Sequence, residues 1–172
     1  MPESVDLPKG RMRVLQGVNG STLVDDSYNS SPDAVVSAFD AMKGLRISGR
    51  KILALGDMME LGQYSAEEHR RIGSETKTVL GMSGMLITVG QRSRLVAEEA
   101  IRSGVMPELV KSFDRSSEAA QFLSSIVSRG DVVLVKGSQS VRTERITAAL
   151  LREPQKAGIL LVRQEPEWLA KP

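Results

Sequence analysis

The stretch Leu23-Val24-Asp25-Asp26-Ser27-Tyr28-Asn29-Ser30-Ser31-Pro32-Asp33 begins as a strand and ends as the start of a helix. Residues 21–24 are rich in β-branched and apolar side chains, as a short buried strand requires. Ser31-Pro32-Asp33 suits a helix start, because it offers a capping hydroxyl, a fixed φ and a negative charge. Residues 25–29 therefore form a polar loop at the carboxyl end of a strand, where open α/β sheets bind ligands.

The rest of the chain alternates short apolar strands with amphipathic helices. Upstream, residues 11–18 and 21–25 are predicted to form a hairpin across Asn19-Gly20, a strong turn signal. Further strands are predicted at 51–56, 84–90, 109–113 and 131–136, and helices at 32–45, 65–80, 93–103, 116–128 and 141–151. This alternation predicts an α/β fold with a mostly parallel sheet, helices on both faces and an N-terminal antiparallel hairpin strand.

Two of these helices carry recognisable signals at their N-termini. Ser65-Ala66-Glu67-Glu68 has the pattern of a capping box. Asp114 or Ser116 is expected to cap the helix that ends near residue 128.

The two ends of the chain differ in composition from its middle. Residues 1–9 contain two prolines and mixed charge, and we interpret them as a linker or domain hinge before a main domain at residues 10–152. Residues 153–172 form a tail without a clear pattern, in which Ile159–Val162 is interpreted as an edge strand and Trp168 as a cover for the core.

Composition limits the classes of protein to which the chain can belong. Its 172 residues, 41% of them hydrophobic and 26% charged, suit one globular domain. A net charge of +2 without a basic stripe argues against nucleic-acid binding. The sequence lacks cysteine, an N-terminal hydrophobic signal and an apolar run of membrane-spanning length, so we expect a cytoplasmic protein without a membrane partner.

Four strand ends carry polar or glycine residues that can share one site. Because the carboxyl ends of parallel strands meet at one edge, these segments should converge there. They are Asp25–Asn29, Gly56-Asp57-Met58, Val89-Gly90 and Lys136-Gly137-Ser138. The chain contains neither G-x-x-x-x-G-K-[ST] nor G-x-G-x-x-G after a strand, so its ligand is not held by such a phosphate loop.

Each of these residues also has a simpler interpretation. Asp25 and Asp26 can cap the turn into the helix, and one of them is expected to do no more. Arg11 can be a solvated cation, and Lys136 can extend along the surface. His69, the only histidine, is expected to be structural, and we expect no metal site in this chain.

Several blocks of the sequence, in this order, resemble the C-terminal domain of the Mur ligases over roughly residues 9–151. They are Gly10-Arg11-Met12, Leu23–Asn29, Leu55-Gly56-Asp57-Met58-Met59-Glu60-Leu61-Gly62, His69 and Val133–Ser138. The resemblance implies a Rossmann-like domain of a three-domain, ATP-dependent amide-forming enzyme. It also implies a central domain that carries the P-loop, the magnesium ligands and a carbamylated lysine, and that presents an acyl phosphate.

Within that family the resemblance implies the activity that adds D-alanyl-D-alanine to UDP-N-acetylmuramoyl-tripeptide in peptidoglycan synthesis. The expected partners are the N-terminal and central domains and these two substrates. By resemblance, Arg11 approaches the ATP phosphates from the hinge, and Asp26 contacts the nucleotide, at its ribose, beside Tyr28 and Asn29. The residues expected to bind the dipeptide are Lys136, Gly137 and Ser138 at its carboxylate, together with Asp57. A guanidinium suits phosphate, a carboxylate suits a diol, and an ammonium suits a carboxylate.

The sequence departs from the family pattern in two ways. The usual Tyr-Asn-Ala-Asn-Pro is here Tyr28-Asn29-Ser30-Ser31-Pro32, which loses the second amide but keeps a helix cap. The N-terminal and central domains are absent from these residues, so we expect an excised domain or half of a split enzyme, without activity on its own.

Three alternatives remain open on the sequence alone. A receiver-type phosphoacceptor domain is also a parallel α/β fold with an acidic pair, a later acid at Asp57 and a lysine at Lys136. A non-catalytic interaction module would give Arg11 and Asp26 no role. Sister ligases that add glutamate or a diamino acid belong to the same family.

Overall fold

The computed structural model describes residues 7–172, so most of the linker predicted at residues 1–9 lies outside the described residues. Six strands form one sheet in the order β1-β2-β6-β3-β4-β5, in which only the β1–β2 pair is antiparallel. The strands are β1 (Arg13–Gln16), β2 (Thr22–Asp26), β3 (Lys51–Gly56), β4 (Met85–Val89), β5 (Val110–Phe113) and β6 (Val132–Lys136). This confirms the predicted Rossmann-like α/β fold.

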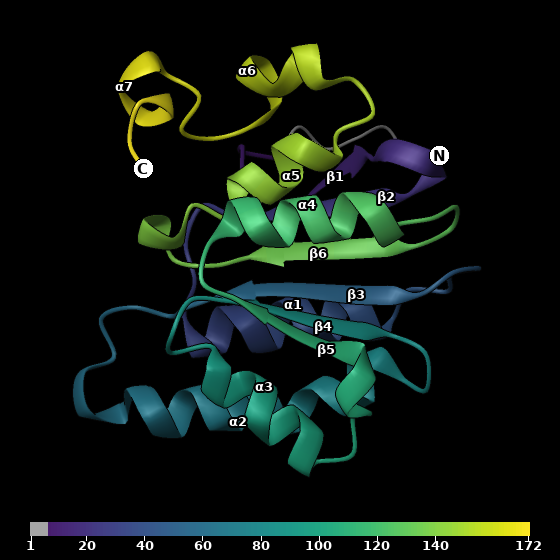
Figure 1. Ribbon diagram of the computed structural model, residues 1–172, viewed down its shortest axis with the longest axis vertical. Helices are drawn as coiled ribbons and strands as arrows, with labels where there is room; N and C mark the ends of the chain where they lie inside the picture. Colours follow the sequence, from purple (N-terminus) through teal and green to yellow (C-terminus); the bar gives the residue numbers. More distant parts are fainter. Residues whose placement is uncertain (1–6) are drawn as a thin grey trace.

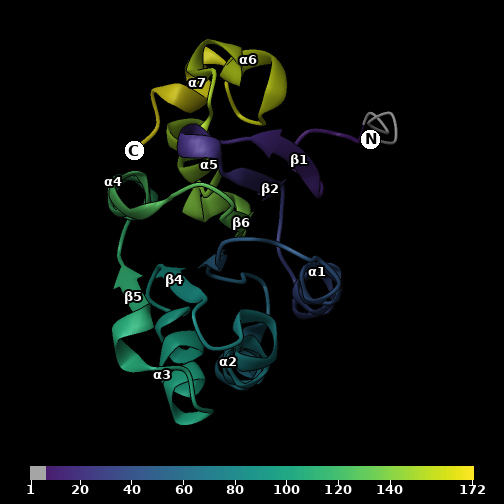
Figure 2. The same cartoon turned by 90° about the vertical axis from the view of Figure 1, so that its right-hand side faces the viewer.

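Helices cover both faces of the sheet. They are α1 (Pro32–Lys43), α2 (Ser65–Leu80), α3 (Arg94–Arg102), α4 (Ser116–Ile126), α5 (Glu144–Leu150), α6 (Ala157–Leu160) and α7 (Pro166–Leu169). Figures 1 and 2 show α4 and α5 on one face and α1 and α2 on the other, with α3 packed beside α2.

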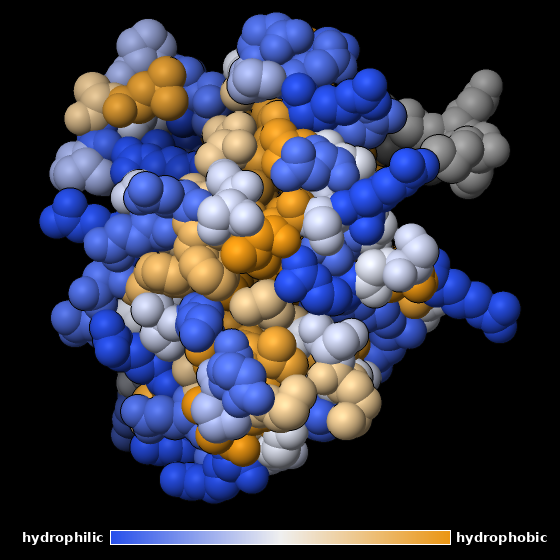
Figure 3. Space-filling model, turned by 45° about the vertical axis from the view of Figure 1, so that its right-hand side comes forward, coloured by the Kyte–Doolittle hydropathy of each residue, from blue (hydrophilic) through white to orange (hydrophobic). Residues whose placement is uncertain are grey.

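Each face of the sheet has its own hydrophobic core because successive strand residues point in opposite directions. In β3, Ile52 and Ala54 pack toward α4 and α5, whereas Leu53 and Leu55 pack toward α1 and α2. Burial on both faces explains why this strand reads as a continuous apolar run. In the space-filling view of Figure 3, apolar side chains also reach the surface as a strip between hydrophilic margins.

The path of the chain places a crevice at the carboxyl ends of β2, β6 and β3. The helix after β2 leaves by one face, whereas β6, the last strand, inserts beside β2 and continues into a helix on the other face. Such a switch point is where open α/β sheets bind ligands. The same order excludes the receiver alternative, because receiver strands run 2-1-3-4-5 and here the last parallel strand lies between the first two.

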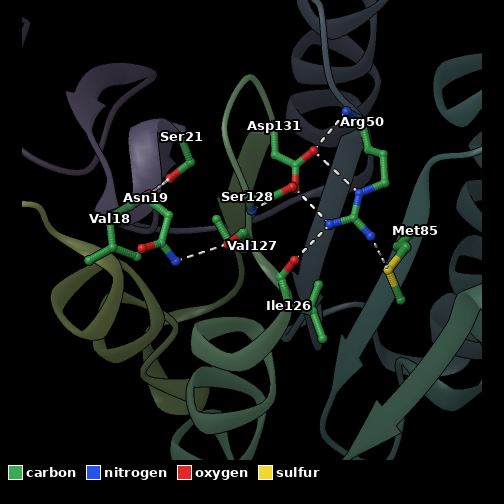
Figure 4. A network of polar contacts seen from close by, with 9 residues as sticks. All are labelled: Val18, Asn19, Ser21, Arg50, Met85, Ile126, Val127, Ser128 and Asp131. Carbon is green, nitrogen blue, oxygen red and sulfur yellow. Dashed lines mark hydrogen bonds and ion pairs between the residues drawn. The ribbon is translucent and has the colours of Figure 1, made fainter.

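An ion pair between Arg50 and Asp131 lies at the opposite edge of the sheet, where β3 and β6 begin (Figure 4). The Arg50 side chain and backbone amide donate to Asp131, with Nη2 2.7 Å from Oδ2 and the amide nitrogen 2.8 Å from Oδ1. Nη2 also donates to the Ile126 carbonyl at 2.8 Å, and the Ser128 amide donates to Asp131 Oδ2. Burial alone would raise the pKa of Asp131, but these hydrogen bonds outweigh burial and lower it.

The predicted turn at Asn19-Gly20 and the predicted helix cap at Ser31 are both confirmed. Asn19 (φ 57°) and Gly20 (φ 79°) both adopt left-handed conformations in the β1–β2 connection, which explains the preference for this residue pair. Ser31 caps α1, because its Oγ accepts the Ala34 amide at 3.3 Å, and Pro32 follows as the first helical residue.

Two predicted helix caps are wrong. Ser65 is the first residue of α2 and does not cap it, since the turn Gly62–Tyr64 already leads into the helix. Neither Asp114 nor Ser116 caps α4; the N-cap is Arg115, whose amide donates to the Glu118 carboxylate at 3.1 Å.

Three further differences lie near the C-terminus. The last predicted helix begins at Glu144, not residue 141, because Arg142 has a φ of 59° that a helix does not tolerate. The edge strand predicted at Ile159–Val162 is wrong, since α6 occupies Ala157–Leu160; Leu161 is buried in the core, and Leu160 packs against it. Trp168 packs against cationic side chains and not over the apolar core.

Candidate functional site

Loops from β2, β3 and β6 meet at the carboxyl edge of the sheet. The segment after β3 is tied to the segment after β6, because the Ser138 amide donates to the Asp57 carbonyl at 3.0 Å and Ser138 Oγ accepts the Met59 amide at 2.9 Å. His69 supports the same segment: its Nε2 accepts the Met58 amide at 3.1 Å, and its Nδ1 lies 2.7 Å from the Ser65 carbonyl. These contacts assign the proton to Nδ1 and confirm the structural role predicted for His69.

The Asp26 carboxylate organises the end of β2. Asp26 Oδ1 accepts the Met12 amide at 3.1 Å, and Oδ2 lies 2.7 Å from Lys136 Nζ on the neighbouring strand. The Lys136 side chain is only 3% exposed and also donates to the Asn29 carbonyl at 3.0 Å. The surface position considered for Lys136 is therefore wrong, and its ammonium instead joins Asp26 to the loop before α1.

The adjacent Asp25 points to the opposite face of the sheet. It is fully buried, and its Oδ1 accepts the Thr147 hydroxyl of α5 at 2.9 Å, whereas Oδ2 has no hydrogen-bond partner among the described residues. Burial raises the pKa of this carboxyl, with Asp26 and Glu144 adding to the effect and hydroxyl donors opposing it. Neither carboxylate caps α1, because Ser31 does.

Four predicted nucleotide-binding residues line one cleft of about 570 Å³, which we call the Arg11 cleft. They are Arg11, Asp26, Tyr28 and Asn29, and Lys136 lines it with them. The Arg11 guanidinium lies 4.4 Å from the centre of the Tyr28 ring. Gly10, at a φ of 69°, approaches so closely that a Cβ there would lie 2.9 Å from the Tyr28 nitrogen, so glycine is required. Arg11 is exposed, and its guanidinium packs over the Tyr28 ring.

A second cleft of about 860 Å³ lies on the other side of residues 28–31, and we call it the Ser138 cleft. Residues 28–31 are a wall common to both clefts. The remaining lining residues are Met59, Glu60, Leu61, Ser138, Gln139, Ser140, Arg142, Trp168, Lys171 and Pro172. The structure thus brings the predicted nucleotide residues and Ser138 to two sides of one loop.

Two predicted dipeptide residues line neither of these clefts. Gly137 is buried, and a Cβ there would lie 2.7 Å from Thr143 Cγ2 and 3.1 Å from the Gly56 Cα, so glycine permits close packing of β6 against β3. Asp57 Oδ1 accepts the Ser93 amide at 2.7 Å before α3, and Asp57 lines a separate hollow of about 460 Å³. Their roles toward the dipeptide remain predictions.

A buried ionic cluster beside the loop was missed by sequence reasoning. Glu144, fully buried, lies 2.5 Å from Arg142 Nε and 3.3 Å from Arg163 Nη2. The Arg163 guanidinium also donates to the carbonyls of Ser27 and Tyr28. These partners are far apart in sequence or lack helical spacing, so no local pattern indicates them.

The donor set of the Arg11 cleft fits a nucleotide. A guanidinium matches phosphate oxygens, a carboxylate with remaining lone pairs matches a ribose diol, and the half-exposed Tyr28 ring offers a stacking surface. Across residues 7–172, no group of three or more metal-ligating side chains is suitably placed for a metal ion. In the same part of the chain, no helix has the length and apolarity to cross a membrane.

Comparisons with known proteins show the family of the chain. The family model described as Mur ligase, glutamate ligase domain, matches residues 10–139. The UDP-N-acetylmuramoyl-tripeptide--D-alanyl-D-alanine ligase of Bacillus subtilis is 26% identical, covering 84% of this chain and 31% of its own length. The enzyme of the same name from Synechocystis is 29% identical, covering 87% and 32%.

Solved structures show the same relationship. The crystal structure of the MurF ligase from Thermotoga maritima in complex with ADP matches with a TM-score of 0.69 and 29% identity, over 89% of this chain and 33% of that one. The chain therefore spans about a third of the length of these relatives.

Proposed function

This chain belongs to the Mur ligase family, and from that premise we propose that it is the C-terminal domain of an ATP-dependent ligase. The ligase would add D-alanyl-D-alanine to UDP-N-acetylmuramoyl-tripeptide in peptidoglycan synthesis, which is the activity that the names of the relatives state. Its partners are the N-terminal and central domains of the same enzyme, and its proposed location is the cytoplasm. The magnesium ligands are proposed to lie in the central domain.

The common wall between the two clefts is the observation that carries this proposal. The Arg11 cleft takes ATP, with Arg11 on phosphate, Asp26 on ribose, and Tyr28 and Asn29 beside them. The ADP bound to the related Thermotoga enzyme supports a nucleotide as the ligand. The Ser138 cleft takes the dipeptide, so that residues 28–31 orient both substrates relative to each other.

The chemistry proposed for this domain is binding and orientation. The Ser138 hydroxyl contributes hydrogen bonding to the dipeptide, and Gly137 keeps the main chain close to β3 behind it. Lys136 acts through its ion pair with Asp26 and its hydrogen bond to Asn29, so it links the two clefts. Asp57 acts by positioning Ser138, whose amide donates to the Asp57 carbonyl at 3.0 Å.

Steady-state kinetics of the full ligase test the division between the clefts. Asp26→Asn should raise KM for ATP more than KM for the dipeptide, whereas Ser138→Ala should raise KM for the dipeptide more. Ser125→Ala is the matched control, because that exposed hydroxyl donates only to the Phe122 carbonyl within α4. Unchanged kinetics in both site variants would contradict the proposal and favour a non-catalytic interaction module.

A further inference from the structure

The C-terminal tail folds back onto the loop that separates the two clefts. In Figure 1, α7 lies on the side of the molecule toward which the arrowheads of β3 and β6 point. The Arg163 guanidinium donates to the Tyr28 carbonyl at 3.2 Å and to the Ser27 carbonyl at 2.5 Å. The tail therefore contacts the main chain of this loop directly, although it lies beyond residues 10–139 that the family model matches.

The cluster around Arg163 is buried. The Arg163 and Arg142 side chains are each 6% exposed, and both arginines pair with the fully buried Glu144. Both arginines adopt left-handed conformations, with φ values of 56° and 59°, which residues other than glycine rarely take. Strained backbone at two converging residues persists only where the surrounding contacts hold it, and it is common near functional sites.

Trp168 fastens the tail to this cluster. Its ring centre lies 5.3 Å from the Arg142 guanidinium, 5.9 Å from the Arg163 guanidinium and 3.9 Å from Lys171 Nζ. Arg142 Nη1 also donates to the Trp168 carbonyl at 3.0 Å. The loop after β2, the start of α5 and the tail are thus held together as one unit.

The tail also contacts the chain on the other side of Arg11. Lys9 Nζ donates to the Gly158 carbonyl at 3.0 Å, and Arg13 Nη1 donates to the Leu160 carbonyl at 3.3 Å. Arg11 lies between these two residues and stacks on Tyr28, whose carbonyl Arg163 holds. The tail therefore contacts residues on both sides of Arg11 in the sequence, as well as the main chain at Tyr28.

We infer that Arg163 is a positioning residue for nucleotide binding: through the Ser27 and Tyr28 carbonyls, it fixes the direction of the Tyr28 and Asn29 side chains. This inference rests on the proposed function, because it takes residues 28–31 as the wall of the nucleotide cleft. Glu144 compensates the charge of the Arg163 guanidinium, with its Oε2 3.3 Å from Nη2.

The test combines hydrogen exchange and kinetics in the full ligase. Arg163→Met removes the donors at similar length, and Arg163→Lys keeps the charge near Glu144 but lacks a planar fork of donors for two carbonyls. Arg152→Met is the matched control, since that exposed arginine, directly before the tail, donates to the Gln16 side chain at 3.1 Å. Exchange is measured by mass spectrometry on peptides that cover residues 23–33 and, as reference, 85–93.

We expect exchange in residues 23–33 to accelerate about tenfold in Arg163→Met, less in Arg163→Lys, and not in Arg152→Met. KM for ATP should rise about tenfold in Arg163→Met with a smaller change in kcat. Should Arg163→Met fail to fold, Arg163→Lys still decides the question, because it preserves the buried charge. Unchanged exchange in residues 23–33 of a folded Arg163 variant would overturn the inference.

The two proposals fail in distinguishable ways. If Asp26→Asn raises KM for ATP but loosening the loop through Arg163 does not, the positioning inference alone is overturned. If neither variant changes KM for ATP although the loop loosens, the nucleotide assignment of the loop is overturned, and the positioning inference falls with it.

Discussion

Replacing Asp26 by asparagine removes the charge that compensates Lys136 and changes little else. Asparagine keeps an oxygen for the Met12 amide, but Lys136 Nζ loses the carboxylate at 2.7 Å and keeps only the Asn29 carbonyl at 3.0 Å. Removal of one partner from a buried ion pair costs about 3–5 kcal/mol. Because one acceptor remains, we expect a loss of about 2–3 kcal/mol, or roughly 4–12 °C in Tm for a chain of this size.

A double variant separates stability from nucleotide binding. Adding Lys136→Met to Asp26→Asn removes the uncompensated charge, and replacing a buried pair in this way is often neutral. We therefore expect the double variant to recover most of the lost stability while KM for ATP stays raised. Asp40→Asn is the control, since its exposed pair with Lys43 should contribute little.

The assays are urea denaturation of this chain and steady-state kinetics of the full ligase on the same set of variants. If the double variant regains both the stability and the KM for ATP of the unmodified ligase, Asp26 acts only on the fold. That result would refute its role in nucleotide binding. If Asp26→Asn lowers the free energy of unfolding no more than Asp40→Asn does, the stabilisation assigned to the buried Asp26–Lys136 pair is refuted.

Three other predictions concern stability, pH and the activity of the isolated chain. The raised pKa of Asp25 means that the folded state binds its proton more tightly than the unfolded state, so this carboxyl lowers stability as pH rises above its ordinary value near 3.8. Asp25→Asn should raise the urea midpoint at pH 8 and flatten its pH dependence, and a lower midpoint at pH 8 would count against this. The lowered pKa of Asp131 has the opposite sign, since its stabilisation exists above pH 3.8 and is lost as pH falls. Asp131→Asn should therefore cost about 3 kcal/mol at pH 7, less in acid, and leave KM for ATP unchanged. The chain alone should release no phosphate from ATP when both substrates and magnesium are present. Calorimetry should find a Kd for ATP above about 1 μM, because contacts from one half of a closed site do not offset the entropy lost on binding.

The sequence predicts the sheet and the loop well because both depend on local patterns. The run Ile52–Leu55 is apolar at every position, as a strand buried on both faces requires, and the turn at Asn19-Gly20 has the positive φ values that this residue pair tolerates. The polar loop before the Ser31 cap follows from the same logic, but its predicted start at residue 25 is wrong, because β2 continues through Asp26. Its place at a strand end is enough to locate the candidate site.

Long-range ionic contacts could not be predicted. Lys136 could equally extend into solvent, and only the parallel register that pairs it with Asp26 directs its ammonium inward. Arg163 reaches carbonyls 135 and 136 positions earlier, and main-chain carbonyls carry no sequence signal. The residues around Ile159 form a helix and not the predicted strand, and a short apolar run does not distinguish the two.

Hydrogen exchange of the full ligase with and without saturating ADP tests the central claim most directly. If the Arg11 cleft takes the nucleotide, ADP should slow exchange in residues 23–33, while residues 116–126 of α4, on the other face of the sheet, keep their rates. Slowed exchange elsewhere in the ligase, with no change in residues 23–33, would contradict the assignment of this loop to the nucleotide.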